Sequence, residues 1–315
     1  MNIKKVGIIG VGSVGASIAF ALMEKGIFNE IVLIDYNKEK AIGEAMDLSH
    51  GILYAKSQAN IYAGEYSDLK DAALIIITAG AAQKEGETRL DLVKKNTSIM
   101  HSIINSLKPV NVEGILLIVA NPVDILTHVA YKLSGLPKER VIGSGTVLDT
   151  ARLKYMLSKH LEVDSRNVHA VMIGEHGDSE LPVWSGANIS GVPLNDFCEL
   201  RGYHNHEEGM KAIYSDVRNA AYEIIKRKGS TYYGIAMAVS KICECIVNNE
   251  HSMLPISVEL NGTYGLEDIA LSIPTVVGNN GAELVLELPL SDKEIDALKR
   301  SADTLKTVIS ELDLN

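Results

Sequence analysis

Short, wholly apolar stretches alternate with helical ones through the first 145 residues of the chain. The apolar stretches are rich in isoleucine, valine and leucine, which predicts strands at residues 6–9, 31–34, 73–78 and 115–119. Because polar residues do not alternate with the apolar ones, we expect strands buried on both faces of a parallel sheet. Helices predicted at residues 13–25 and 38–51 follow the first two strands. This order is typical of βαβ units with right-handed crossovers.

The pattern changes after about residue 145, where longer helical stretches mix with alternating strands. Helices are expected at residues 148–160, 207–228, 233–249 and 292–312. Strands are expected at residues 168–173, 251–259, 270–277 and 283–288. The length of 315 residues is enough for two domains. We therefore predict an α/β protein with a doubly wound parallel sheet over residues 1–145 and an α+β domain over residues 146–315, packed around a cleft.

Charge and cysteine content exclude several classes of protein. Lysine and arginine number 30 against 40 aspartates and glutamates, and the net charge of −10 gives no overall attraction for nucleic acid or anionic lipid. Three cysteines in a chain of this length make no disulfide framework, so we expect reduced thiols and a cytoplasmic protein. The uncharged stretch 6–23 has the length of a marginal membrane span, but its four glycines and its strand-then-helix pattern argue against one.

A glycine-rich turn between the first strand and the first helix points to a dinucleotide. Gly10, Gly12 and Gly15 form a G-x-G-x-x-G pattern. The first glycine permits a tight turn, the second lets the backbone approach a pyrophosphate, and the third lets helix and strand pack closely. Asp35 ends the next strand, where a carboxylate accepts hydrogen bonds from the adenosine ribose and repels a 2′-phosphate, which favours NAD over NADP. The simpler alternative is a glycine turn followed by a surface aspartate.

Four polar segments border the apolar runs and are candidates for the chemistry. Residues 79–89 and 121–124 follow strands, at the sheet edge where open α/β folds bind ligands, and the first of them is predicted to be a closing lid. Asp149 and Arg152 share one helix face, which in isolation indicates only a surface ion pair. His176 lies in a tight glycine-flanked segment with charged neighbours, whereas the other eight histidines are interpreted as structural or solvated.

These segments together resemble the lactate/malate dehydrogenase family, most closely its bacterial lactate-specific branch. The resemblance runs over essentially the whole chain and includes, in family order, GVGSVG, TAGAAQKEGETRLDLVKKN, VANPVD, GSGTVLDTARL, GEHGDSELPVWS and KGSTYYGIA. The family fold, a Rossmann domain followed by an α+β substrate domain, agrees with the pattern above. The resemblance implies a reversible NAD-dependent hydride transfer that interconverts pyruvate and (S)-lactate in fermentative glycolysis, with no metal.

The resemblance also implies a role for each matching residue. His176 is expected to donate and accept the proton, Asp149 to orient that histidine, and Arg152 to grip the substrate carboxylate. Arg89 is expected to polarise the reacting carbonyl, and Asn121 to bind near the nicotinamide and the substrate oxygen. A threonine on the pocket wall and the cofactor positions complete the set: Thr231, then Gly10, Gly12, Val14, Gly15, Asp35, Lys40, Tyr66, Gly80, Ala81, Asn121 and Thr146.

Gln83, on the predicted lid, is the residue expected to select the substrate within the family. A malate dehydrogenase carries arginine there to pair with the second carboxylate of oxaloacetate. A neutral glutamine leaves that carboxylate buried and unpaired, whereas pyruvate has only a methyl group to accommodate. Glu85 stands where the family often has proline, which puts the kinetics of lid closure in question but not the identity.

Two further expectations concern assembly and regulation. The family is usually tetrameric, so we expect a homotetramer. Many bacterial members are activated by fructose 1,6-bisphosphate through an arginine and a histidine at a subunit interface. His169 matches the histidine, but Lys154 replaces the arginine and lacks its two-pronged grip on phosphate, which predicts weak or absent activation. The simpler alternative is a solvated helix lysine with no regulatory role.

Three other functions stay open at this point. A dehydrogenase of bulkier 2-hydroxy acids is the main alternative and would share the same residues. An NAD-dependent glycosidase would share the Rossmann half, but its metal-binding cysteine–histidine pair is not found in the sequence. A non-catalytic NAD-binding protein would not need Arg89, Asp149, Arg152 and His176 together.

Overall fold

The computed structural model describes residues 1–81, 88–203 and 206–312, with Arg89 described by its backbone only. Within this part, six parallel strands form one side of a large sheet: β1 Asn2–Ile9, β2 Glu30–Ile34, β3 Asn60–Ala63, β4 Ala72–Ile77, β5 Ile115–Ile118 and β6 Val141–Gly143. Their order, β6-β5-β4-β1-β2-β3, is that of the doubly wound dinucleotide-binding fold. Every residue of β4 is buried, as its continuous apolar run predicted.

Three strands from the second half of the chain extend this sheet. β12 Ser252–Asn261 pairs antiparallel with β6, and β13 Glu267–Gly278 and β14 Gly281–Val285 follow it outward. Among the described residues the sheet therefore has nine strands. The sequence predicted the three added strands but not their place, because pairing with a strand more than 100 residues away leaves no local pattern.

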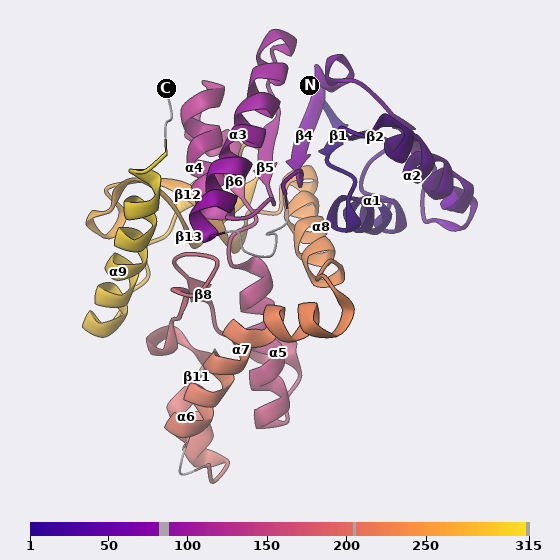
Figure 1. The fold of residues 1–315 in the computed structure, drawn as a ribbon. Helices are drawn as coiled ribbons and strands as arrows, with labels where there is room; N and C mark the ends of the chain where they lie inside the picture. The colour runs from indigo at the N-terminus through magenta and orange to yellow at the C-terminus, as the bar shows by residue number, and fades with distance from the viewer. Residues whose placement is uncertain (82–87, 204–205, 313–315) are drawn as a thin grey trace.

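Helices cover the sheet on both sides. In Figure 1, α3 and α4 stand together to the left of β4, and α1, α2 and α8 lie to its right. α1 packs against α8, and α4 packs against β12 and β13. The helices are α1 Ser13–Lys25, α2 Lys38–Gly51, α3 Arg89–Leu107, α4 Val123–Ser134, α5 Val147–Leu161, α6 Leu194–Leu200, α7 His206–Lys228, α8 Tyr233–Asn248 and α9 Asp292–Ile309. The predicted helices all exist, and α1 and α2 have the predicted bounds.

The prediction of a single strand at residues 168–173 is wrong, because this stretch forms two short strands that belong to different small sheets. The hydroxyl of Thr146, directly before α5, donates to the Met172 carbonyl, and Thr150 Oγ1 of α5 accepts from the Met172 N–H, so threonine side chains occupy backbone groups that a continuous strand ladder would use. The strands concerned are β7 Val168–His169, β10 Asn188–Ile189 and β11 Val192–Pro193 in one sheet, and β8 Met172–Ile173 and β9 Leu181–Pro182 in the other.

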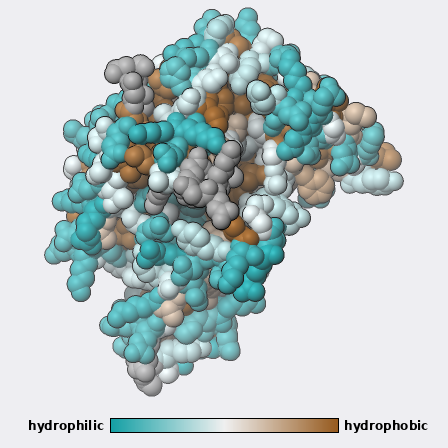
Figure 2. All heavy atoms as spheres, viewed as in Figure 1, coloured by the Kyte–Doolittle hydropathy of each residue, from teal (hydrophilic) through white to brown (hydrophobic). Residues whose placement is uncertain are grey.

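The surface shown in Figure 2 is mainly hydrophilic, and its apolar residues gather toward the centre and the upper part of the face. The main hydrophobic core contains side chains from both halves of the chain. None of the described helices is long and apolar enough to cross a membrane. Cys198, Cys243 and Cys245 are buried free thiols.

Candidate active site

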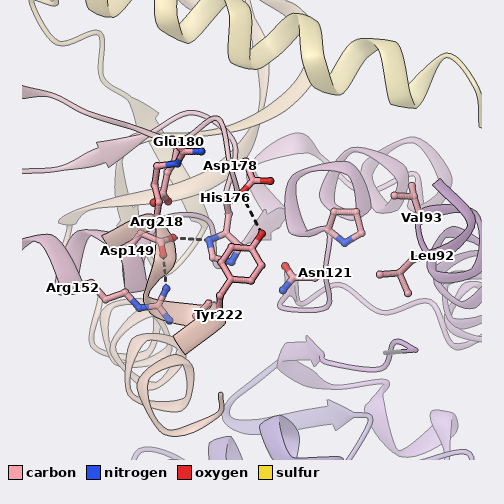
Figure 3. Close-up of a pocket in the computed structure, with 13 residues that line it drawn as sticks. Leu92, Val93, Asn121, Asp149, Arg152, His176, Asp178, Glu180, Arg218 and Tyr222 are labelled. Atoms are coloured by element: carbon pink, nitrogen blue, oxygen red, sulfur yellow. Dashed lines mark hydrogen bonds and ion pairs between the residues drawn. The ribbon is translucent and has the colours of Figure 1, made fainter. Parts of the chain in front are cut away.

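A cavity of about 310 Å³ lies where the two halves of the chain meet. Its walls come from α3, the loop after β5, α5, the loop after β8 and α7 (Figure 3). Eight of the 13 described residues that line it have polar or charged side chains: Asn121, Asp149, Arg152, His176, Asp178, Glu180, Arg218 and Tyr222. Four of these, Asn121, Asp149, Arg152 and His176, are residues that the sequence predicted to act together.

Asp149 links two of the predicted functional groups. It lies in the first turn of α5 and is 2% exposed. One carboxylate oxygen accepts a hydrogen bond from His176 Nδ1 at 2.5 Å, and the other accepts one from Arg152 Nη1 at 2.8 Å (Figure 3). Burial raises the pKa of Asp149, but the positive charges and hydrogen bonds of His176 and Arg152 outweigh burial and hold it below the usual range. The group is therefore a carboxylate that fixes an imidazole and a guanidinium.

The electrostatic surroundings of His176 keep its ring protonated. Burial lowers the pKa of the ring, but the charge and hydrogen bond of Asp149, together with the charges of Asp124 and Glu180, raise it to about 9. With both ring nitrogens protonated near neutral pH, Nδ1–H is held by Asp149 and Nε2–H is the proton that can be donated. The side chain is 26% exposed, so the ring can reach a ligand in the cavity.

Backbone contacts hold the loop that carries His176. Gly174, at φ 90°, exchanges two backbone hydrogen bonds with Ser272 of β13, at 2.9 and 3.0 Å. The N–H of Glu175 donates to Ser301 Oγ of α9 at 2.9 Å. The loop is therefore attached to the sheet and to the last helix directly before His176.

A second cavity, of about 690 Å³, lies at the glycine-rich turn. Seven of the predicted cofactor residues line it: Gly10, Gly12, Asp35, Lys40, Tyr66, Gly80 and Ala81. Gly10 has a φ of 95°, and a Cβ on Gly15 would lie 1.9 Å from the Gly10 carbonyl oxygen, so the first and third glycines are needed for the turn and for helix packing. A Cβ on Gly12 would meet nothing within 4 Å, which leaves open space at the N-terminus of α1. This open N-terminus fits a pyrophosphate.

Two family models together cover nearly the whole chain. Residues 4–143 match the lactate/malate dehydrogenase NAD binding domain, and residues 146–313 match the alpha/beta C-terminal domain of the same family. The chain belongs to the lactate/malate dehydrogenase family.

Relatives in this family match the chain from end to end. An L-lactate dehydrogenase of Acetivibrio thermocellus is 54% identical over 312 residues, which cover 99% of this chain and 98% of the relative. An L-lactate dehydrogenase of Thermoanaerobacterium saccharolyticum is 53% identical over 311 residues, with 99% and 100% covered. The ligand-bound structure of the minor L-lactate dehydrogenase from Enterococcus mundtii has a TM-score of 0.96 at 43% identity, and 99% of both chains is covered.

Several residues expected from the family pattern lie elsewhere or are not described. Gln83 falls outside the described residues, as does the side chain of Arg89, whose backbone begins α3. Half-buried Thr231 lies between α7 and α8 and is not among the described residues that line the first cavity. Thr146 is fully buried at the start of α5, with its hydroxyl on the Met172 carbonyl. Val14 and Gly15 lie on α1 and are not among the described residues that line the second cavity, and the cofactor roles of all these positions stay predictions.

The contributions of α7 and Glu180 to this cavity were not predicted from the sequence. Glu180 lines the cavity at 3% exposure, and burial together with the charge of Asp149 raises its pKa to about 8. Arg218 and Tyr222 project into the same cavity one helical turn apart, and the Tyr222 hydroxyl donates to Asp178 at 3.2 Å. Their i, i+4 spacing was the available signal, but a polar stripe on a long helix more often marks a solvated face.

Two groups of described side chains hold three ligand atoms each within 4.8 Å of one another, as a metal site would. In the first, Arg152 already pairs with Asp149 next to His176 and Glu180. The second group is His128, Glu259 and Asp268, where Lys132 pairs with Asp268 and His128 with Glu259. Because a side-chain cation already pairs with one carboxylate of each group, we assign no metal to either.

Proposed function

We propose that the chain is an NAD-dependent L-lactate dehydrogenase that interconverts pyruvate and (S)-lactate. The observation that carries this proposal is the single carboxylate of Asp149 that holds His176 and Arg152 side by side. A proton donor next to a bidentate carboxylate-binding group is what reduction of a 2-oxo acid requires. The full-length relatives named L-lactate dehydrogenase support the same reaction.

Each side chain of the cavity has a separate role in the proposed reduction. When bound, NADH supplies the hydride. The planar guanidinium of Arg152 pairs with the substrate carboxylate and fixes the orientation of the neighbouring carbonyl carbon. As negative charge develops on the carbonyl oxygen, His176 Nε2 donates its proton to that oxygen, and Asp149 stabilises the ring throughout. We assign the Arg89 side chain to polarise the same carbonyl, and Asn121 to bind beside it.

Steady-state assays of NADH oxidation test the proposal. Pyruvate, oxaloacetate and longer 2-oxo acids are compared as substrates of the same enzyme preparation. We expect kcat/KM to be highest for pyruvate. A higher value for a longer 2-oxo acid would instead support the alternative of a dehydrogenase for bulkier 2-hydroxy acids, and no turnover of any of them would contradict the enzyme assignment.

Asp35 is proposed to select NAD over NADP. Its carboxylate lies in the second cavity and accepts hydrogen bonds from the N–H groups of Val11 at 2.7 Å and Asn37 at 2.9 Å. The negative charge therefore stands where a ribose 2′-phosphate would have to bind. In Asp35→Ser we expect the preference for NADH over NADPH, measured as a ratio of kcat/KM, to fall by roughly 10- to 100-fold. An unchanged ratio would show that the carboxylate does not face the ribose.

For regulation, we infer weak or absent activation by fructose 1,6-bisphosphate. Lys154 and His169 line a third cavity, of about 390 Å³, which brings the two predicted effector residues to one site. Burial lowers the pKa of Lys154, and its ammonium lacks the fork that grips phosphate. Lys154→Arg should strengthen activation, measured as the decrease in KM for pyruvate with added effector. Strong activation of the unmodified enzyme by micromolar effector would contradict this inference.

We also infer a homotetramer located in the cytoplasm. Large apolar side chains on α1 and α2 are exposed, among them Phe20 and Met46 at 56% each, and subunit contacts would cover them. The three free thiols fit a reducing compartment. Light scattering coupled to size-exclusion chromatography measures the oligomer directly, and a monomer at assay concentration would contradict the inference.

A further inference from the structure

Asp124 is a buried carboxylate that contacts the backbone of His176. It lies in the first turn of α4 and is 2% exposed. Its carboxylate accepts hydrogen bonds from the His176 backbone N–H at 2.7 Å, from Ser257 Oγ at 2.6 Å and from Ser272 Oγ at 3.3 Å. Ser257 belongs to β12 and Ser272 to β13. One side chain thus joins a helix, two strands and the loop that carries the proton donor.

The cost of burying this charge argues for a functional reason. Hydrogen bonds from two hydroxyls and one amide satisfy the oxygens of Asp124, but they bring no neutralising charge. In the described part of the chain no lysine or arginine forms an ion pair with it. Burial accordingly raises the pKa of Asp124 to about 6. An uncharged side chain of the same shape would be cheaper to bury if the role were packing alone.

We propose that Asp124 is a positioning residue for the proton transfer of the proposed reaction. It fixes the backbone of His176 while Asp149 fixes the ring, and its negative charge favours the imidazolium form. Holding both ends of the residue determines where Nε2 points, and small displacements of a reacting group are costly. This inference rests on the proposed function for its kinetic part only.

Charged and titratable groups face His176 from each element packed around its loop. Asp149 and Arg152 come from α5, Asp124 from α4, Arg218 and Tyr222 from α7, and Glu175, Asp178 and Glu180 from the loop itself. Asp124 differs from the others because one of its hydrogen bonds is accepted from the backbone N–H of His176. Its charge and its hydrogen bond can be separated by substitution. In Asp124→Asn the amide oxygen still accepts from the His176 N–H and the amide NH₂ can donate to Ser257 Oγ, so geometry is kept and charge is removed.

The charge is tested by NMR titration of the His176 ring in the free enzyme with labelled histidine. We expect the pKa of His176 to fall by about one unit in Asp124→Asn. Glu294→Gln is the matched control, because Glu294 is also a buried carboxylate bonded to two serines, Ser185 and Ser291, but it does not line the cavity. The control should leave the His176 pKa unchanged. An unchanged pKa in Asp124→Asn would overturn the electrostatic part of the proposal.

The positioning is tested by kinetics at a pH low enough for His176 to be protonated in every variant. Asp124→Ala should lose about 10- to 100-fold in kcat for pyruvate reduction, with KM within about threefold of the wild type because Arg152 is intact. Asp124→Asn should keep most of kcat under the same conditions. Equal kcat values for the two variants would overturn the positioning role.

Two further measurements distinguish a failure of Asp124→Ala to fold from a failure of the proposal, and a failure of the proposal from a failure of the proposed function. If Asp124→Ala does not fold, Ser257→Ala tests the same arrangement, since it leaves the charge but removes one of the bonds that hold the carboxylate. We then expect a loss of kcat of roughly three- to tenfold with an unchanged His176 pKa, and unchanged kcat would overturn the proposal. If the wild type fails to reduce pyruvate, the proposed function is wrong, but the NMR titration still decides the role of the Asp124 charge.

Discussion

Replacing Gln83 by arginine should shift the substrate preference from pyruvate toward oxaloacetate by roughly 10³- to 10⁵-fold in the ratio of kcat/KM values. The extra carboxylate of oxaloacetate would be buried without a partner beside a neutral glutamine. A guanidinium at the same place would pair with it through two parallel hydrogen bonds. Competition assays of NADH oxidation with the two substrates, before and after the substitution, measure the change directly.

Gln83→Leu is the matched control for this experiment. It removes the amide and adds no charge, so it should not improve the use of oxaloacetate. Gln83 lies outside the described residues, and its place beside the substrate side chain is inferred from the family pattern. If Gln83→Arg kept the wild-type preference for pyruvate, that placement would be wrong, whereas the proposed roles of Asp149, Arg152 and His176 would be unaffected, because they are argued from the hydrogen bonds that join these three side chains.

Four of the six parallel strands, β1, β2, β4 and β5, could be predicted because their signals are local, whereas the short strands β3 and β6 were missed. A strand buried on both faces, such as β4, must be apolar along its whole length, and the sequence shows this directly. The glycine turn is local in the same way. A positive φ at Gly10 and the close approach of α1 at Gly15 both require residues without a side chain. The spacing of these glycines in the sequence therefore predicts the turn.

Features that depend on distant residues could not be predicted from the pattern. β12 pairs with β6 at Ser257–Gly143 and Val258–Ile142. The sequence of neither strand indicates which strand it pairs with. The division of residues 168–173 into two strands follows from contacts with α5. Asp124 is the clearest case in the site, because its carboxylate serves a residue 52 positions away and an aspartate at a helix N-terminus has an ordinary local explanation.

Replacing Asp149 by asparagine should lower kcat for pyruvate reduction by roughly 10²- to 10⁴-fold. The two oxygens of Asp149 serve two donors, His176 Nδ1–H and Arg152 Nη1–H. Asparagine offers one oxygen and an NH₂ group, so one of these donors must face another donor. The substitution therefore disturbs either His176, the proposed proton donor, or Arg152, the proposed partner of the substrate carboxylate.

The same substitution should change the pH dependence in a defined direction. In the proposed reaction, reduction requires protonated His176, so we expect kcat/KM to fall as pH rises through the pKa of His176, which is about 9 in the wild type. Burial lowers this pKa and Asp149 is the main group that raises it, so in Asp149→Asn the alkaline fall should move to lower pH by about two units. Oxidation of lactate requires the neutral ring, and its rise with pH should move in the same direction.

Asp164→Asn is the control for the pH profile, because Asp164 also pairs with an arginine, Arg166, but lies at the surface away from the cavity. It should leave the pH dependence of both reduction and oxidation unchanged.

A pH profile that does not move in Asp149→Asn would mean that another group stabilises the protonated form of His176. Among the described residues, Asp124 and Glu180 are the other carboxylates that most raise the pKa of His176, and the pKa of Glu180 is itself raised to about 8, so Glu180 is largely protonated at neutral pH. Asp124 would then be the residue that keeps the ring charged, and the alkaline fall would move with Asp124→Asn instead.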